Sequence, residues 1–156
     1  MRHEEKSVCI ETEEMNGMSA NSVLTLQNYV VKNIVFKLNT SFQARGDEIE
    51  LHPEFRRIIH KIDADTAAID LIFKIDGASD VPFMMDICIE GVFSMPDWDK
   101  AESRDLMISN TAAILFPYLR ALITMITTNA NIPPYTLPVM NINELFAKAE
   151  TSNIMK

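Results

Sequence analysis

The sequence predicts an α+β domain in which the strands come first and the helices follow. Between Leu24 and Met95, apolar and polar residues alternate in several segments, which is the period of strands with one buried face. After Pro96 the apolar residues recur every three or four positions, which is the period of helices. We expect one domain over residues 23–150, since a chain of 156 residues is long enough to bury a core.

Four predicted strands occupy the first two thirds of this domain, at residues 24–38, 55–62, 66–75 and 81–95. Turn signals separate them at Arg45-Gly46-Asp47 and Asp76-Gly77. Strands that follow one another through short connections favour an antiparallel meander. In the first strand the even positions, from Leu24 to Leu38, are expected to share the buried face.

The longest helix is expected from about Thr111 to Asn129, after a short helix at 101–108. Pro117 has no N–H to donate, so the regular helix is expected to begin near Ile114 with Pro117 close to its first turn. The apolar residues form two neighbouring stripes, one with Leu115, Leu119, Leu122 and Ile126, the other with Ile114, Tyr118, Ala121 and Met125. A helix that is apolar on two sides needs a partner besides its own sheet, and a symmetric oligomer supplies one.

A loop at 129–138 leads to a final short helix. Asn141 and Glu144 have the spacing of a capping box, so we expect this helix to begin just after Asn141 and to run through Leu145, Phe146 and Ala149. Residues 1–22, which are rich in glutamate, and residues 151–156 are expected to be tails.

The net charge of −8 and the pI of about 4.8 argue against a nucleic-acid or anionic-membrane partner. The first 22 residues lack the apolar core of a secretory signal, and no run of 18 apolar residues favours membrane insertion. The two cysteines, Cys9 and Cys88, form no CxxC motif. Together these features predict a cytoplasmic protein.

Sequence motifs for catalysis are lacking. The four glycines form no nucleotide-binding loop, and the three histidines have no metal-ligand spacing. We therefore expect no enzyme activity, no cofactor and no metal. One alternative is an enzyme that binds a small ligand or a metal and uses His60 with Asp63 or Asp65; another is a purely structural oligomer.

The C-terminal third is the most specific part of the sequence. The stretch ILFPYLRALI (114–123) resembles the long-helix signature of the SecB family of molecular chaperones. EGVFSM (90–95) is similar to the end of the last strand in that family. The proline-rich loop at 133–141 and the final helix at 142–146 follow in the family's order.

This resemblance implies a four-stranded antiparallel sheet with helices packed on one face, assembled as a tetramer of two dimers. It also implies an ATP-independent holdase that binds unfolded or precursor polypeptides. Members of the family either hand precursors to the SecA translocase or protect an antitoxin of a toxin–antitoxin system. The resemblance places client contacts at Phe55, Ile59, Met84, Val92, Leu145 and Phe146, and the oligomer interface at Ile114, Leu115, Tyr118, Leu119, Leu122 and Ile126.

The residues implied for a SecA-type contact are acids on the outer face of the sheet. Here Asp86 matches the family's acid in the last strand, and Glu90 lies near it. In the first strand, however, Asn33 and Lys37 stand where the family has acids. Handover to SecA in protein export is the first expectation, and the antitoxin role is the alternative. Losing one acid and reversing another weakens electrostatic docking, which gives weight to a solitary or antitoxin-directed role.

Overall fold

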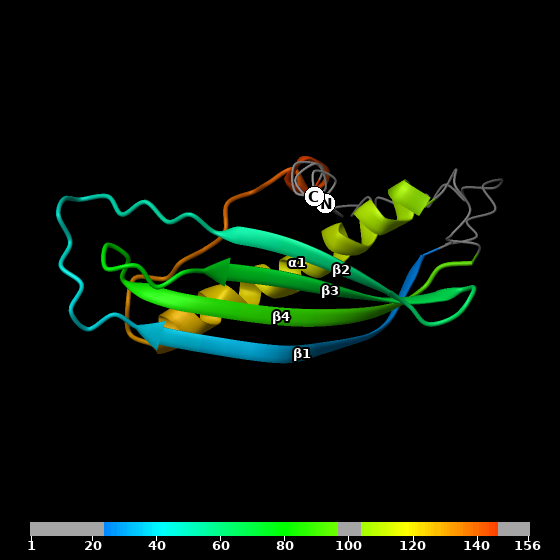
Figure 1. The fold of residues 1–156 in the computed structure, drawn as a ribbon, viewed down its shortest axis with the longest axis horizontal. Coiled ribbons are helices and arrows are strands. Elements are labelled where there is room, and N and C mark those ends of the chain that lie inside the picture. The colour runs from blue at the N-terminus through cyan, green and yellow to red at the C-terminus, as the bar shows by residue number, and fades with distance from the viewer. Residues whose placement is uncertain (1–23, 97–103, 147–156) are drawn as a thin grey trace, which may run out of the picture.

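The computed structural model describes residues 24–96 and 104–146, so the expected tails lie outside the described residues. The elements follow the predicted α+β order: β1 (Thr25–Leu38), β2 (Glu54–Lys61), β3 (Thr66–Ile75), β4 (Phe83–Ser94) and α1 (Arg104–Asn129). The strands form one antiparallel sheet (Figure 1). The predicted fold class is therefore confirmed.

The order of the strands across the sheet is β1-β4-β3-β2. The expected meander holds for β2, β3 and β4, but it is wrong for β1, which pairs with β4 instead of β2. The connection over residues 39–53, here called the crossover connection, passes the ends of the two central strands (Figure 1). Its length is what permits this Greek-key arrangement, and it leaves both β1 and β2 at an edge of the sheet.

Two irregularities in β1 change the face on which its residues lie. The register shifts between Leu26 and Asn28 and again between Val31 and Asn33. Each extra residue reverses the alternation. The expectation that all even positions share the buried face is therefore wrong for the segment between the shifts, where Tyr29 and Val31 oppose Gly91 and Ile89 on the inner face. The shifts keep the polar Asn28 and Lys32 out of the core.

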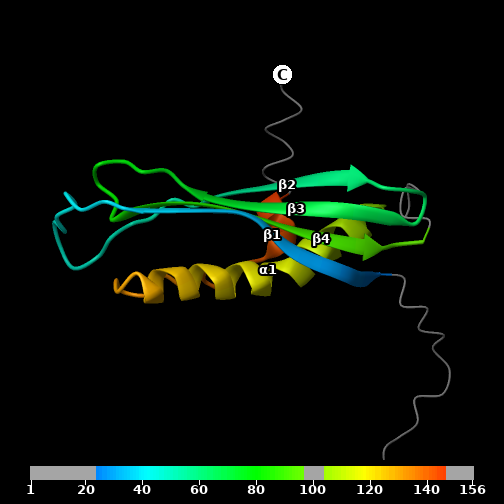
Figure 2. The same cartoon turned by 90° about the horizontal axis from the view of Figure 1, so that it is seen from below.

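Helix α1 lies beneath one face of the sheet (Figure 2). Strand β4 alternates strictly, with its odd residues buried toward α1 and its even residues half-buried on the outer face. The largest fully buried side chains come from β3, β4, α1 and Met95, namely Phe73, Phe93, Ile69, Leu71, Ile75, Met85, Ile87, Ile89, Met95, Leu115, Leu119 and Ile123. They form the core between the sheet and α1.

Gly91 lets α1 approach β4 closely. A Cβ at this position would lie 2.7 Å from Leu115 Cδ2 and 2.7 Å from Phe93 Cε2. Those distances are far inside van der Waals contact, so the packing of α1 on β4 requires glycine here.

The long helix begins at Arg104, earlier than expected, and continues without a break to Asn129. Pro117 therefore lies inside the helix, and the prediction that it falls near the first turn is wrong. Figure 2 shows that the two halves of α1 are not collinear, as expected for a helix with an internal proline. By length and composition Ile108–Asn129 could cross a membrane, but its buried residues pack against the sheet as those of a core helix do.

The chain leaves α1 through Asn131, whose φ of 58° is left-handed. The N–H of Ile132 donates to the Thr127 carbonyl and that of Asn131 to the Thr128 carbonyl, as in a Schellman cap. The chain then passes back along α1, where the N–H of Tyr135 donates to Thr127 Oγ1. Further on, the Asn141 side chain accepts from the N–H of Asn143 and caps the helix at 142–146, as predicted.

Candidate functional site

Large apolar side chains lie exposed on several parts of the described chain. The first surface, here called the β1–α1 surface, carries Val31, Ile34 and Leu38 on the inner face of β1 with Tyr118 and Met125 of α1, while Val30 and Val35 lie on the outer face of the same edge strand. The second, here called the crossover surface, carries Ile49, whereas Ile58 lies on the outer face opposite Asp70, and Ile62 lies in the turn after β2, at the other end of that strand. Exposed apolar surface of this kind marks sites of interaction with other polypeptides.

On the β1–α1 surface, β1 is a 14-residue edge strand with apolar residues on both faces. Long, apolar edge strands readily pair with other chains. The consecutive apolar pairs Val30–Val31 and Ile34–Val35 signal a strand covered on both sides. The sequence prediction singled out none of these residues, although that signal was present.

Helix α1 divides its apolar residues differently from the two expected stripes. Leu115 and Leu119, which were predicted to lie in the oligomer interface, are fully buried against the sheet of their own chain. Ile114, Leu122 and Ile126 are half-buried, and Tyr118 is exposed. Beside them a groove of about 490 Å³ lies between α1 and Thr136, lined by Phe116, Pro117, Arg120, Ala121, Thr124, Met125 and Thr136. The side of α1 that faces away from the sheet is thus hollowed and largely apolar.

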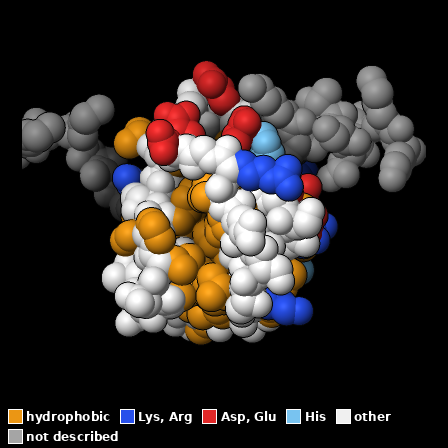
Figure 3. Space-filling view, turned by 90° about the vertical axis from the view of Figure 1, so that its left-hand side faces the viewer, with side chains coloured by type: hydrophobic (Ala, Val, Ile, Leu, Met, Phe, Trp, Pro, Cys, Tyr) orange, Lys and Arg blue, Asp and Glu red, His pale blue; other side chains and the backbone are white. Residues whose placement is uncertain are grey.

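The crossover surface contains a cavity of about 730 Å³. It lies between the crossover connection and the residues that join β3 to β4, and Ile49, Ile75 and Val81 supply apolar lining. Acidic lining residues outnumber basic ones: the acids are Glu48, Glu50, Glu54, Asp76 and Asp80, and the basic residues are Arg45 and His52. Figure 3 views this end of the molecule and shows an exposed apolar strip with acidic side chains gathered at one end of it.

The residues predicted to contact clients do not form one site. Phe55 and Phe146 are buried in the core, where Phe55 packs edge-on against Phe73 and Arg57 lies over the Phe146 ring. Ile59 and Leu145 are half-buried on the same side of the sheet. Met84 and Val92 are half-buried on the opposite, outer face, where they belong to the even residues of β4.

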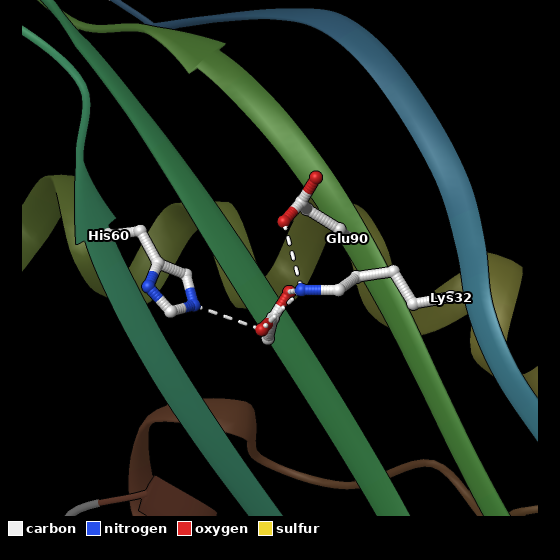
Figure 4. Close-up of polar contacts among 4 residues, drawn as sticks. Lys32, His60 and Glu90 are labelled. Carbon is white, nitrogen blue, oxygen red and sulfur yellow. Dashed lines mark hydrogen bonds and ion pairs between the residues drawn. The ribbon is translucent and has the colours of Figure 1, made fainter.

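The residues predicted for a SecA-type contact, Asp86 and Glu90, both lie on the outer face. Each of them binds a side chain of the same chain. Lys32 Nζ lies 3.2 Å from Glu90 Oε2 (Figure 4). Asn33 Nδ2 donates to Asp86 Oδ1 over 3.3 Å. Neither acid therefore stands alone on the surface.

Asp70 of β3 is the centre of this outer-face cluster. Lys32 Nζ lies 3.0 Å and 2.9 Å from its two carboxylate oxygens, and His60 Nε2 lies 2.9 Å from Oδ2 (Figure 4). Burial of Asp70 works to raise the pKa of its carboxyl, but the hydrogen bonds with Lys32 and His60 outweigh burial and hold that pKa below its ordinary value. The same bonds, first to Asp70 and then to Glu90, raise the pKa of Lys32. The cluster thus joins all four strands through polar side chains of Lys32, His60, Asp70 and Glu90.

In the alternative hypothesis of an enzyme, His60 acts with Asp63 or Asp65, but the structure gives His60 a different partner. His60 is paired with Asp70, not with Asp63 or Asp65. Asp63 instead accepts the N–H of Asp65 in the turn after β2. Burial raises the pKa of the nearby Cys88 thiol, which makes it a poorer nucleophile. Among residues 24–96 and 104–146, no three His, Cys, Asp or Glu side chains are grouped to hold a metal.

Comparison with known proteins gives a consistent family assignment. The family model described as SecB, preprotein translocase subunit SecB, matches residues 18–153. An uncharacterized protein of Methanocaldococcus jannaschii is 33% identical over 132 residues, covering 81% of this chain and 84% of the relative. The protein-export protein SecB of Nitrosococcus oceani is 23% identical over 133 residues and 80% of each chain. That of Anaplasma phagocytophilum is 30% identical over 74 residues, 46% of this chain and 47% of the relative.

A solved structure shares the fold. It is a SecB-like chaperone from Mycobacterium tuberculosis in complex with a ChAD peptide from an antitoxin. The TM-score is 0.58 at 14% identity, over 76% of this chain and 88% of that one.

Proposed function

The chain belongs to the SecB family of chaperones, and on that premise we propose that it is an ATP-independent holdase that binds non-native polypeptides in the cytoplasm. The observation that carries the proposal is the exposed apolar area on two separate surfaces of a small acidic chain. Unfolded clients expose apolar side chains that such surfaces can cover. The excess of negative charge keeps a protein with exposed apolar surface in solution.

We assign the two surfaces to different partners. The β1–α1 surface combines an apolar edge strand with the apolar groove on α1, and a second copy of the same chain matches both features. Assembly through Tyr118, Leu122, Ile126 and Ile114 gives the dimer of dimers that the family resemblance implies. Such a complex covers β1, whose exposed edge would otherwise be prone to aggregation.

The crossover surface is then left for the client. Ile49 is exposed there, while Ile58 is exposed on the outer face and Ile62 in the turn between β2 and β3. The half-buried Ile59 and Leu145 lie on the inner side of the sheet. Phe55 and Phe146 can take part only if the helix at 142–146 moves away from the core, because both are buried. The outer-face residues Met84 and Val92 would form a separate client contact.

The outer face of the sheet bears on the choice between export handover and antitoxin protection. Export would require SecA to dock on acids such as Asp86 and Glu90, yet Asn33 and Lys32 hold both. This favours the second candidate, protection of an antitoxin, over export handover. The fold is shared with a chaperone that was solved with an antitoxin peptide, which supports the same choice.

Aggregation of a thermally unfolding client, followed by light scattering without nucleotide, tests the proposal. The full chain should suppress aggregation at a near-stoichiometric ratio. Ile49→Ser should weaken suppression, while Val139→Ser, which removes an even more exposed apolar side chain elsewhere, should not. Absence of suppression at every ratio rules out the holdase.

A further inference from the structure

The outer face of the sheet is electrically balanced, although the chain as a whole carries a net charge of −8. On this face the strands contribute equal numbers of cations and anions: Lys32, Lys37, Arg56 and Lys74 against Glu54, Asp70, Asp86 and Glu90. The face is therefore not the acidic surface that the composition of the chain would give on average.

Two of these anions lie directly opposite each other. The register of β3 and β4 pairs Asp70 with Glu90, and like charges in that position repel. Asp70 is nearly buried, with 7% of its side chain exposed, which strengthens the repulsion. A cation between the two carboxylates is needed to offset it.

Lys32 supplies that cation from the far edge of the sheet. It lies at the second register shift of β1, between Val31 and Asn33. From there its side chain passes over β4, and its ammonium bonds both oxygens of Asp70 and one of Glu90 (Figure 4). One residue thus offsets the repulsion within the pair and halves the negative charge that the two acids place at the centre of this face.

We infer that Lys32 is a specificity-determining residue, which closes the outer face of the sheet to partners rich in lysine and arginine. With Lys32 in place, a basic partner must displace an ammonium already bound to both carboxylates. Electrostatic docking depends on unpaired charge of opposite sign, and here the central acids are paired within the chain. The inference rests on the proposed function only in taking the chain to be one that binds polypeptides.

The test compares Lys32→Gln with Lys37→Gln in the full chain, using a fluorescent decalysine peptide at low ionic strength. The two changes remove the same charge from the same strand, but Lys37 has no ion pair within the described residues. We expect Lys32→Gln to bind the peptide roughly fivefold or more tightly than the unchanged chain, and Lys37→Gln less than about twofold, with the gain lost at high salt. An equal gain from both variants would mean that net charge alone decides, and would overturn the inference.

Loss of Lys32 also leaves the Asp70 and Glu90 carboxylates facing each other, which could destabilise the fold. A second pair of variants separates this loss of stability from the effect on peptide binding. In an Asp70→Asn background the repulsion is removed, and Lys32→Gln should still tighten peptide binding by freeing Glu90. No gain in either background contradicts the inference. Suppression of client aggregation is measured separately on the unchanged chain, which distinguishes failure of the holdase proposal from failure of this inference.

Discussion

The rings of Tyr29 and Tyr118 stack with their centroids 4.8 Å apart, and this contact joins β1 to α1 beside the core. Burial, and then the neighbouring Tyr118, raise the pKa of Tyr29. The stack lies where the β1–α1 surface begins, because Val31 follows Tyr29 on the inner face of β1. It fixes the relative position of the two elements that we assign to self-assembly.

Charge placed on the β1–α1 surface should dissociate the oligomer without unfolding the chain. Ile34 and Met125 are 46% and 53% exposed, so a glutamate at either position remains solvated in the monomer. In a dimer interface the same glutamate would be buried without a partner. We expect Ile34→Glu and Met125→Glu to give monomers by size-exclusion chromatography with light scattering, with the circular dichroism of the unchanged chain.

Leu119→Glu is the contrasting variant. Leu119 is fully buried under its own sheet, so a charge there should abolish folding instead of assembly alone. A folded Leu119→Glu monomer, or an unchanged oligomer in Met125→Glu, would contradict the division of α1 into a core side and an interface side.

Gly91→Ala should destabilise the fold, since its Cβ would collide with the Leu115 and Phe93 side chains. Overpacking of this kind costs about 1–3 kcal/mol in the free energy of unfolding, measured by urea denaturation. A Leu115→Ala background removes the collision with Leu115 and leaves only that with Phe93, so the cost should shrink. Equal costs in both backgrounds would show that contact with Leu115 is not the cause.

Asp70 should make stability depend on pH in the acid range. Its carboxyl pKa is lower in the folded chain than the ordinary value of about 4. Its contribution is therefore complete above pH ~4 and is lost as the pH falls through the folded pKa. The difference in unfolding free energy between the unchanged chain and Asp70→Asn should shrink below pH 4. The exposed Asp80→Asn serves as control, and a difference that stays constant with pH would contradict this account.

Most of the fold follows from local patterns. Alternation located the four strands, the spacing of apolar residues located α1, and Asn141 marked the start of the last helix. The features that were missed depend on neighbours distant in sequence. The shifts in β1 arise from its pairing with β4, and a helix can continue through Pro117 when tertiary packing supports both sides.

The site was less predictable for the same reason. Periodicity shows that α1 has two apolar sides, but which side faces the sheet is set by the packing of Leu115 against Gly91. Burial of Phe55 and Phe146 likewise depends on contacts across the fold. The Lys32–Asp70–Glu90 cluster requires the register of three strands, and no local pattern in the sequence carries that register.

The most direct test of the chaperone assignment is binding of one polypeptide in two states. A disulfide-bonded protein is compared in its native form and in a form kept unfolded by reduction and alkylation with iodoacetamide. Isothermal titration calorimetry of the full chain, without nucleotide, should show binding of the unfolded form, with a negative heat-capacity change from apolar burial, and no binding of the native form. Equal binding of both forms, or binding of neither, would contradict the assignment.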